Sequence, residues 1–271
     1  MTSGVPWTWL GSVTSSRLNI EPALTGPALP PARAFCVVRD RVPADVAARA
    51  ASRFGLAKEG AGSSRSTAAM LVAEASRDTV RRALDQNSFL TVELTELEDT
   101  TGAIDGDWLG APPVEHGFYL SLTTGTAYGM QCAVLVCDEL ARRGVLRAER
   151  RGNIELCLHE AIANAIVHGN MGIPSSAKEQ PEGYRLFGQL LKERLGDHDV
   201  RQRRLDIFAR WSGDSLNIAV VDQGGGFDTT ALPEQADGGA HSGRGFLFMR
   251  ALAKRVNVTD GGRCTVLHFD L

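Results

Sequence analysis

Two runs of alternating apolar residues, joined by a tight turn, constrain this chain more than any other feature. The first run extends from Leu205 to Trp211 and the second from Leu216 to Val220, with a turn at residues 212–214 between them. A period of two on both sides of a short turn predicts an antiparallel hairpin with one buried face. The second strand runs into Asp222 and then a triple glycine. Because these glycines follow a hairpin strand and not the first strand of a βαβ unit, a dinucleotide-binding site of the Rossmann kind is excluded.

A helix is predicted from Ile154 to His168, ending at Gly169. Glu160, Asn164 and His168 fall at i, i+4 and i+8 and share one polar stripe, while apolar residues crowd the other side. A carboxylate can accept a proton, and an Asn oxygen is a hard, neutral ligand suited to Mg²⁺. The pattern alone also fits a solvated helix face, with His168 as a cap of the last turn.

A third segment, Ser242-Gly243-Arg244-Gly245, opens a helix predicted from Phe246 to Val256. The unpaired N–H groups and positive dipole of such a helix start suit an anion such as a polyphosphate. The chain has four lysines, none after a G-x-x-x-x-G, so a P-loop is absent.

The order of these segments is more specific than any one of them. The stretches H-E-A-I-A-N-A-I-V-H-G-N, V-V-D-Q-G-G-G-F-D, S-G-R-G-F-L-F-M-R and G-G-R-C-T-V-L closely resemble the N-box, the two glycine boxes and the final strand of the GHKL ATPase superfamily. Within it, the chain is most similar to the anti-sigma-factor serine/threonine kinases of bacterial partner-switching systems. The resemblance covers roughly residues 117–271. It implies a Bergerat-type α/β sandwich, in which helices cover one face of a mixed sheet.

The resemblance also implies the cofactors, ATP and Mg²⁺, and a role for each site residue. Glu160 would be the general base, Asn164 would ligate Mg²⁺, and Asp222 would bind the adenine amino group. The other implied cofactor-binding residues shape the adenine pocket (Gly224, Gly226, Thr265) or close over the phosphates at the end of a lid at 229–242 (Gly243, Arg244, Gly245).

The implied function is that of an ATP-dependent serine/threonine protein kinase that phosphorylates a small antagonist protein. A sigma factor and a second copy of the chain are further candidate partners. Two alternatives stay open: an ATP-gated protein-binding module without phosphotransfer, and a histidine-kinase-like signalling protein. A formal net charge of −3 disfavours nucleic acid or an anionic membrane as partner. Five widely spaced cysteines and the lack of a leader or an 18-residue apolar run indicate a cytoplasmic protein.

The N-terminal part is expected to be organised differently. Residues 1–33 read as a flexible tail, 34–99 as a small βαβαβ domain with strands at 35–38, 70–73 and 89–94, and 100–116 as a linker. The small domain resembles a degenerate response-regulator receiver. Asp40 stands without a second acid and the third strand ends at Thr95-Glu96, so we expect a docking or dimerising module.

An insertion between Asn170 and Leu205 is longer than in the minimal kinases that the chain resembles. Its basic run at residues 201–204 is interpreted as a solvated surface, in preference to a docking site for an acidic partner.

Overall fold

The computed structural model describes residues 37–40, 42, 44–46, 69–73, 75–85, 88, 90–94, 116–178, 182–227 and 244–271. The predicted tail at 1–33, nearly all of the linker, the lid at 229–242 and Gly243 lie outside these residues, as does most of the helix expected after Pro43.

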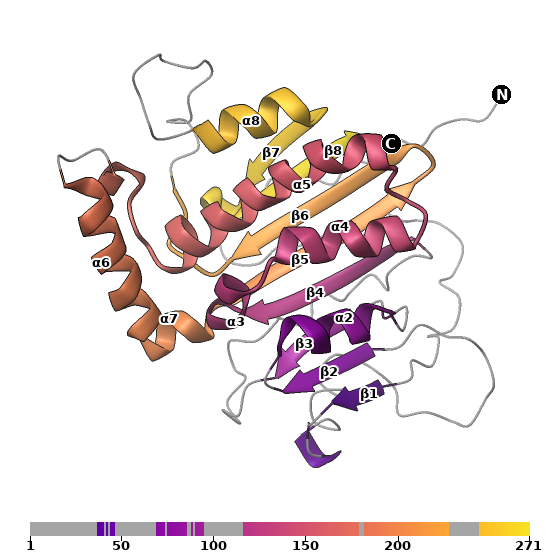
Figure 1. The fold of residues 1–271 in the computed structure, drawn as a ribbon, viewed down its shortest axis with the longest axis horizontal. Coiled ribbons are helices and arrows are strands. Elements are labelled where there is room, and N and C mark those ends of the chain that lie inside the picture. Colours follow the sequence, from indigo (N-terminus) through magenta and orange to yellow (C-terminus); the bar gives the residue numbers. More distant parts are fainter. Residues whose placement is uncertain are drawn as a thin grey trace.

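The chain forms one sheet with helices over one of its faces (Figure 1). The strands are β1 (Val37–Asp40), β2 (Ala69–Ala73), β3 (Leu90–Leu94), β4 (Gly117–Thr123), β5 (Arg204–Ser212), β6 (Ser215–Asp222), β7 (Arg255–Thr259) and β8 (Cys264–Asp270). The longer helices are α2 (Arg77–Asp85), α4 (Cys132–Arg142), α5 (Ala148–Ala163), α6 (Gly183–Gly196) and α8 (Arg244–Leu252). Shorter ones are α3 (Thr124–Gly129), the π-helix η3 (Asn164–Asn170), the 3₁₀ turns η4 (Ser175–Lys178) and η6 (Asp260–Gly262), and α7 (His198–Gln202).

The described strands form an eight-stranded mixed sheet in the order β1-β2-β3-β4-β5-β6-β8-β7. The pairs from β1 to β4 are parallel and those from β4 to β7 are antiparallel. This is the mixed α/β sheet with helices on one face that the sequence predicts. The predicted hairpin is also confirmed: β5 and β6 pair from Leu205 opposite Asp222 to Ser212 opposite Ser215.

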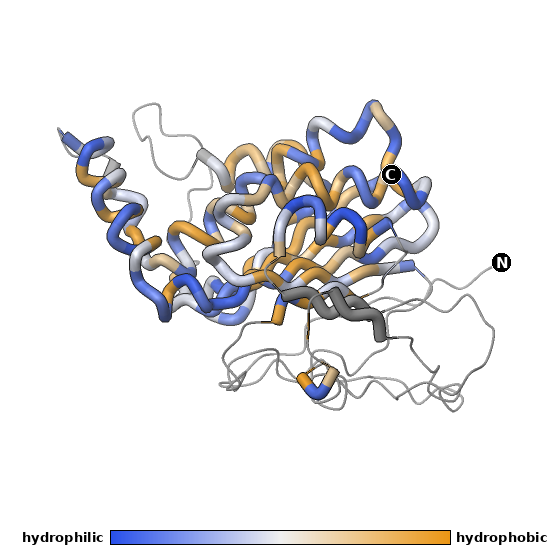
Figure 2. Tube along the Cα trace, turned by 60° about the horizontal axis from the view of Figure 1, so that its bottom comes forward, coloured by the Kyte–Doolittle hydropathy of each residue, from blue (hydrophilic) through white to orange (hydrophobic). Residues whose placement is uncertain are grey.

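The core lies between this sheet and the helices, where the turned view shows apolar residues concentrated (Figure 2). Alternate residues of β5 and β6, among them Ile207 and Ile218, are fully buried against apolar residues of α4 and α5 such as Leu135 and Leu158. The end of the sheet where β6 finishes is therefore fixed by packing, and so is the C-terminal end of the helical run formed by α5 and η3.

The strand predicted at 35–38 is β1, which extends to Asp40, and the boundaries of two predicted helices also need correction. The helix expected at 246–256 is α8, which ends at Leu252, and Arg255 already belongs to β7. The helix expected to begin at Ile154 begins at Ala148, and from Asn164 it continues as a π-helix.

The N-terminal strands do not form the separate small sheet that we expected. β3 pairs in parallel with β4, so β1, β2 and β3 extend the sheet of the C-terminal part. The buried Glu93 of β3 stabilises the contact between β3 and the end of β4. Its carboxylate accepts hydrogen bonds from the Thr123 N–H and the Thr126 hydroxyl, both at 2.6 Å. The division into domains at 34–99 and 117–271 stays a prediction, whereas the shared sheet is a property of the fold.

Candidate functional site

The polar stripe predicted on the helix lies on the end of α5 and on η3. Glu160 and Asn164 are half-buried, and no hydrogen bond or ion pair joins either side chain to another described residue. His168 differs, because its Nδ1 lies 2.6 Å from the carbonyl oxygen of Ile173 and the ring holds the chain just after η3. Two side chains with hard oxygen atoms are thus available to a ligand, and His168 has a structural contact.

The beginning of α8 lies directly against Glu160. A Cβ built on Gly245 would come 2.4 Å from Oε2 of Glu160, so only glycine fits there without moving the carboxylate. This contact joins two of the three segments singled out in the sequence, which lie more than 80 positions apart. It also brings the Glu160 carboxylate to the N-terminal turn of α8, where backbone N–H groups lack helical partners.

Asp222 lies at the other end of the stripe, against Gly169 of η3. A Cβ on Gly169 would be 2.4 Å from Cγ of Asp222, and a Cβ on Gly224 would be 2.1 Å from the carbonyl oxygen of Gly169. The main chain of η3, the aspartate and the glycine loop are therefore in direct contact. Gly169 was not among the predicted site residues.

The backbone after β6 is held by three successive hydrogen bonds. The Asp222 N–H donates to the Arg263 carbonyl (3.0 Å), the Gln223 N–H to Oδ1 of Asn170 (2.7 Å) and the Gly224 N–H to Oδ1 of Asp222 (2.8 Å). Within the described part of the chain, Oδ2 of Asp222 has no donor. One carboxylate oxygen is therefore held by its own loop and the other can accept a hydrogen bond from a ligand.

Burial sets the protonation of this carboxyl group. Asp222 is 7% exposed, and desolvation raises its pKa to about 6, although the Gly224 N–H and the charge of Arg263 act in the opposite direction. A buried carboxylate gains from a hydrogen bond to a ligand amino group, by about 1.5–3 kcal/mol.

The far wall of the glycine loop is formed by the turn between β7 and β8. Gly226 has φ +71°, and a Cβ there would be 2.1 Å from the carbonyl oxygen of Gly261, while the Phe227 N–H donates to that same oxygen (2.8 Å). Thr265 is buried in β8 and lies opposite Val220 of β6. Val220 comes two residues before Asp222, so the two share one face of β6. Gly224 therefore packs against η3 beside Asp222, Gly226 packs against the β7–β8 turn, and Thr265 lies on the strand next to β6. Their roles in an adenine pocket stay a prediction.

The helical run spaces the two halves of the site. Glu160 and Gly169 are nine positions apart, about 13 Å along a helix, which suits an extended nucleoside triphosphate with its base at Asp222 and its phosphates at α8. The carboxylate of Glu160 and the amide oxygen of Asn164 are the donor types that Mg²⁺ accepts, and one or two protein ligands suffice where phosphates supply the others. The residues present therefore fit both ATP and Mg²⁺. The side chain of Arg244 and all of Gly243 lie outside what the structure describes.

A mixed sheet with a polar helical stripe, a carboxylate at a strand end and a glycine-flanked helix start defines an ATP-binding protein of the histidine-kinase-like class. Residues 130–269 match the family model of the histidine kinase-like ATPase domain, and the chain belongs to this family. A search among curated proteins found no matching relative. Among the described residues, no helix is long and apolar enough to cross a membrane.

The basic run at 201–204 is the clearest correction to the sequence interpretation. Arg204 is only 4% exposed; its Nε and Nη2 donate to the Ser121 hydroxyl and its Nη1 to the Glu93 carbonyl. The Arg203 guanidinium donates to the carbonyl oxygen of Asn170. These two arginines hold strands and η3 together at the site's end of the sheet, so the prediction of a solvated surface was wrong for them.

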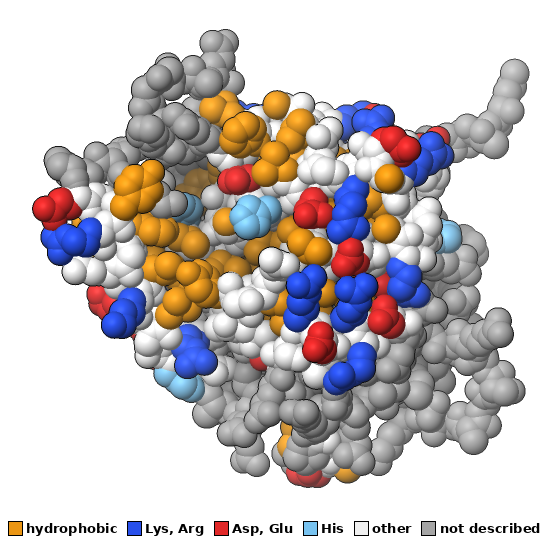
Figure 3. Space-filling model, viewed as in Figure 1, with side chains coloured by type: hydrophobic (Ala, Val, Ile, Leu, Met, Phe, Trp, Pro, Cys, Tyr) orange, Lys and Arg blue, Asp and Glu red, His pale blue; other side chains and the backbone are white. Residues whose placement is uncertain are grey.

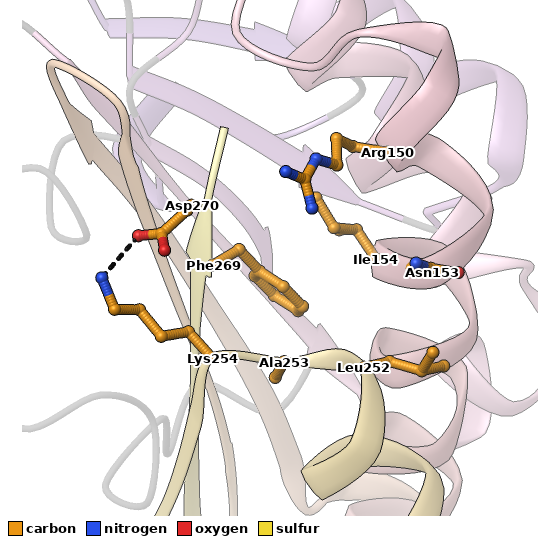
Figure 4. Close-up of a pocket in the computed structure, with 8 residues that line it drawn as sticks. All are labelled: Arg150, Asn153, Ile154, Leu252, Ala253, Lys254, Phe269 and Asp270. Carbon is orange, nitrogen blue, oxygen red and sulfur yellow. Dashed lines mark hydrogen bonds and ion pairs between the residues drawn. The ribbon is translucent and has the colours of Figure 1, made fainter.

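A separate cavity lies far from these residues, at the other end of α5 (Figure 4). It has a volume of about 250 Å³ and contains the ion pair between Lys254 and Asp270 at 2.8 Å. Asn153, on its wall, precedes Asn164 by 11 positions, or roughly 16 Å of helix. It is therefore not part of the nucleotide site. Its lining residues are Arg150, Asn153, Ile154, Leu252, Ala253, Lys254, Phe269 and Asp270.

Proposed function

We propose that this histidine-kinase-like ATPase is a serine/threonine protein kinase of the partner-switching type, which transfers phosphate from ATP to a small antagonist protein. The observation that carries the proposal is the placement of Glu160. Its half-buried carboxylate has no partner among the described residues, lies one helical turn before Asn164 and touches the first turn of α8 at Gly245. A site that needed only affinity for ATP would have no use for a base at the phosphate end.

In this proposal each group has one task. Asp222 accepts a hydrogen bond from the adenine amino group through Oδ2, and the start of α8 holds the phosphates. Asn164 would hold Mg²⁺, which supplies neutralisation of phosphate charge when bound. Glu160 accepts the proton of the attacking serine or threonine hydroxyl. Phosphoryl transfer depends mainly on positioning and charge neutralisation, so these groups are sufficient without a catalytic lysine.

The proposed setting is the cytoplasm, with a small antagonist protein as acceptor and a sigma factor or a second copy of the chain as further partners. The helix α6 of the insertion supports a protein partner. Tyr184 is 79% exposed and Leu186 41%, and apolar side chains gather beside α6 in the view from the helix side (Figure 3). Contiguous exposed apolar patches often mark interaction sites.

The test is phosphorylation by the purified chain and its Glu160→Gln variant. Each is incubated with Mg-ATP and proteins that co-purify with it, and modified residues are identified by mass spectrometry. The variant should keep ATP affinity and lose transfer by about 10²–10⁴-fold, the usual contribution of a positioned base. Glu155→Gln, on the same helix and paired with Arg151 at 3.1 Å, is the matched control and should retain transfer.

The same α6 observation favours a second candidate, a nucleotide-gated binding module. ATP binding with no modified acceptor would contradict the kinase proposal, whereas equal modification by the wild-type protein and the Glu160→Gln variant would refute the assignment of Glu160 as the base. The first of these outcomes, together with nucleotide-dependent retention of a partner, would support the binding module.

A further inference from the structure

Asn170, the last residue of η3, is a buried side chain whose amide is hydrogen-bonded through both its oxygen and its nitrogen. It is 0% exposed, and its amide makes three hydrogen bonds. Oδ1 accepts from the Gln223 N–H (2.7 Å), while Nδ2 donates to the Thr124 hydroxyl (2.7 Å) and to the Arg204 carbonyl (2.9 Å). One side chain thus joins η3 to the start of α3, to the first residue of β5 and to the residue that follows β6.

The orientation of this amide is fixed by its partners. A flipped amide would place its NH₂ against the Gln223 N–H and its oxygen against the Arg204 carbonyl, which would replace two hydrogen bonds by two repulsive contacts. Asn is also the residue type that the site requires, because it combines one acceptor with two donors on a short side chain. The buried position makes each of these bonds costly to lose.

The Gln223 bond has a direct consequence for Asp222. It fixes the peptide group that follows Asp222, and the Gly224 N–H then holds Oδ1 of Asp222. On the other side, Gly169 touches the same carboxylate. Strand pairing and the Arg263 carbonyl hold the backbone of Asp222 itself, Asn170 fixes the peptide group that follows it, and Gly169 borders its carboxylate.

We propose that Asn170 is a positioning residue for nucleotide binding: it sets the place of the Asp222 carboxylate relative to the Mg²⁺-side residues of the helix, without contacting the nucleotide itself. The proposal rests on the proposed binding of ATP at this site. It assigns to Asn170 an effect on the adenine end and none on the chemical step, because Glu160 and Asn164 lie ten and six positions before Asn170 and make no hydrogen bond to it.

The test compares Asn170→Ala with Thr124→Val in the full-length chain. Thr124 is also fully buried, and its replacement removes one hydrogen bond of Asn170 without touching the oxygen that receives the Gln223 N–H. Affinities for ADP and adenosine are measured with and without Mg²⁺, beside urea unfolding curves. Asn170→Ala should lower both affinities by roughly tenfold or more, equally with and without Mg²⁺, and leave the transfer rate at saturating ATP within about twofold. Thr124→Val should lose stability and change affinity less than about threefold.

Equal affinity losses in the two variants, or a loss of stability alone in Asn170→Ala, would overturn the proposal. If Asn170→Ala does not fold, amide hydrogen exchange in Asn170→Ser replaces the binding assay. Faster exchange of the Gln223 N–H, with unchanged exchange in the middle of β6, would support the assigned bond, and unchanged exchange at Gln223 would refute it. Failure of the proposed function has a different signature, because the wild-type chain would then bind no adenine nucleotide.

Discussion

At the scale of single residues, the site combines groups that carry chemistry with groups that hold them. The sequence predicts roles for Glu160, Asn164 and Asp222, because their residue types suit a proton acceptor, a metal ligand and a hydrogen-bond acceptor and because the family resemblance implies those roles. It could not identify Gly169 or Asn170. Asn170 acts on Gln223 across 53 positions of the chain, and Gly169 acts by lacking a side chain where Asp222 lies. Such roles arise only when distant segments meet.

Asp222 makes the free energy of unfolding of the nucleotide-free protein depend on pH. Because its folded pKa of about 6 lies above the ordinary 3.8, the folded state binds this proton more tightly than the unfolded chain. That contribution to stability is complete below the ordinary pKa and is lost as the pH rises through about 6. Asp222→Asn should therefore raise the free energy of unfolding at about pH 7.5, by up to about 3 kcal/mol, with a smaller gain at about pH 5.

Urea unfolding of the nucleotide-free wild-type protein and the variant at both pH values is the measurement. An equal gain at the two pH values would show that the buried charge is not the cause. The same variant should lose ATP affinity, since an Asn amide reproduces the shape of the carboxylate but not its charge. A buried charge that serves binding usually lowers stability, so its removal is expected to raise stability and weaken binding.

At the scale of elements, hydrophobic period and glycine positions predict most helices and strands. The hairpin and the polar stripe follow from local pattern. The change to a π-helix at Asn164 does not, because it depends on what η3 packs against. β5, β6 and α3 all contact it. π-Helical turns often occur at functional sites, and here the turn contains Asn164, His168, Gly169 and Asn170.

Two glycines of this helical run should respond to alanine in opposite ways. Gly152 is exposed in α5, with nothing within 4 Å of the place that an alanine methyl group would take, so Gly152→Ala should stabilise the protein by about 0.5–1 kcal/mol and leave binding unchanged. Gly169→Ala must displace the Asp222 carboxylate and should weaken ATP binding by roughly tenfold or more. Calorimetric measurement of ATP binding and thermal unfolding of both variants would test these two expectations. Normal ATP affinity in Gly169→Ala would mean that the aspartate is not held by this contact.

At the scale of the whole molecule, the sequence predicts the hairpin pairing of β5 with β6 but not the pairing between strands that are far apart in the chain. The pairing of β3 with β4 joins segments separated by a stretch that reads as a linker, and no local pattern specifies it. The sheet that results contains β1, β2 and β3 together with the strands that carry the site. Helix α2 adds to the junction, since Arg81 pairs with Asp138 of α4 at 3.5 Å.

The shared sheet predicts a single cooperative unfolding transition for the described parts of both segments. Glu93→Ala removes the acceptor of the Thr123 N–H and the Thr126 hydroxyl, and should lower the free energy of unfolding by about 1.5–3 kcal/mol. Glu193→Ala, on exposed α6, is the control and should change it by less than about 0.5 kcal/mol. Circular dichroism and differential scanning calorimetry would measure both. Two separate transitions, with only the minor one shifted by Glu93→Ala, would show that the N-terminal strands fold independently.

The contacts of Gly169 with Gly224 and of Gly226 with Gly261 join main chain to main chain. Boundaries made of peptide groups cannot be enlarged or reshaped by exchanging side chains, as most binding pockets can. Side-chain substitutions are therefore expected to change the surroundings of this main-chain frame, such as α6, more readily than the frame itself.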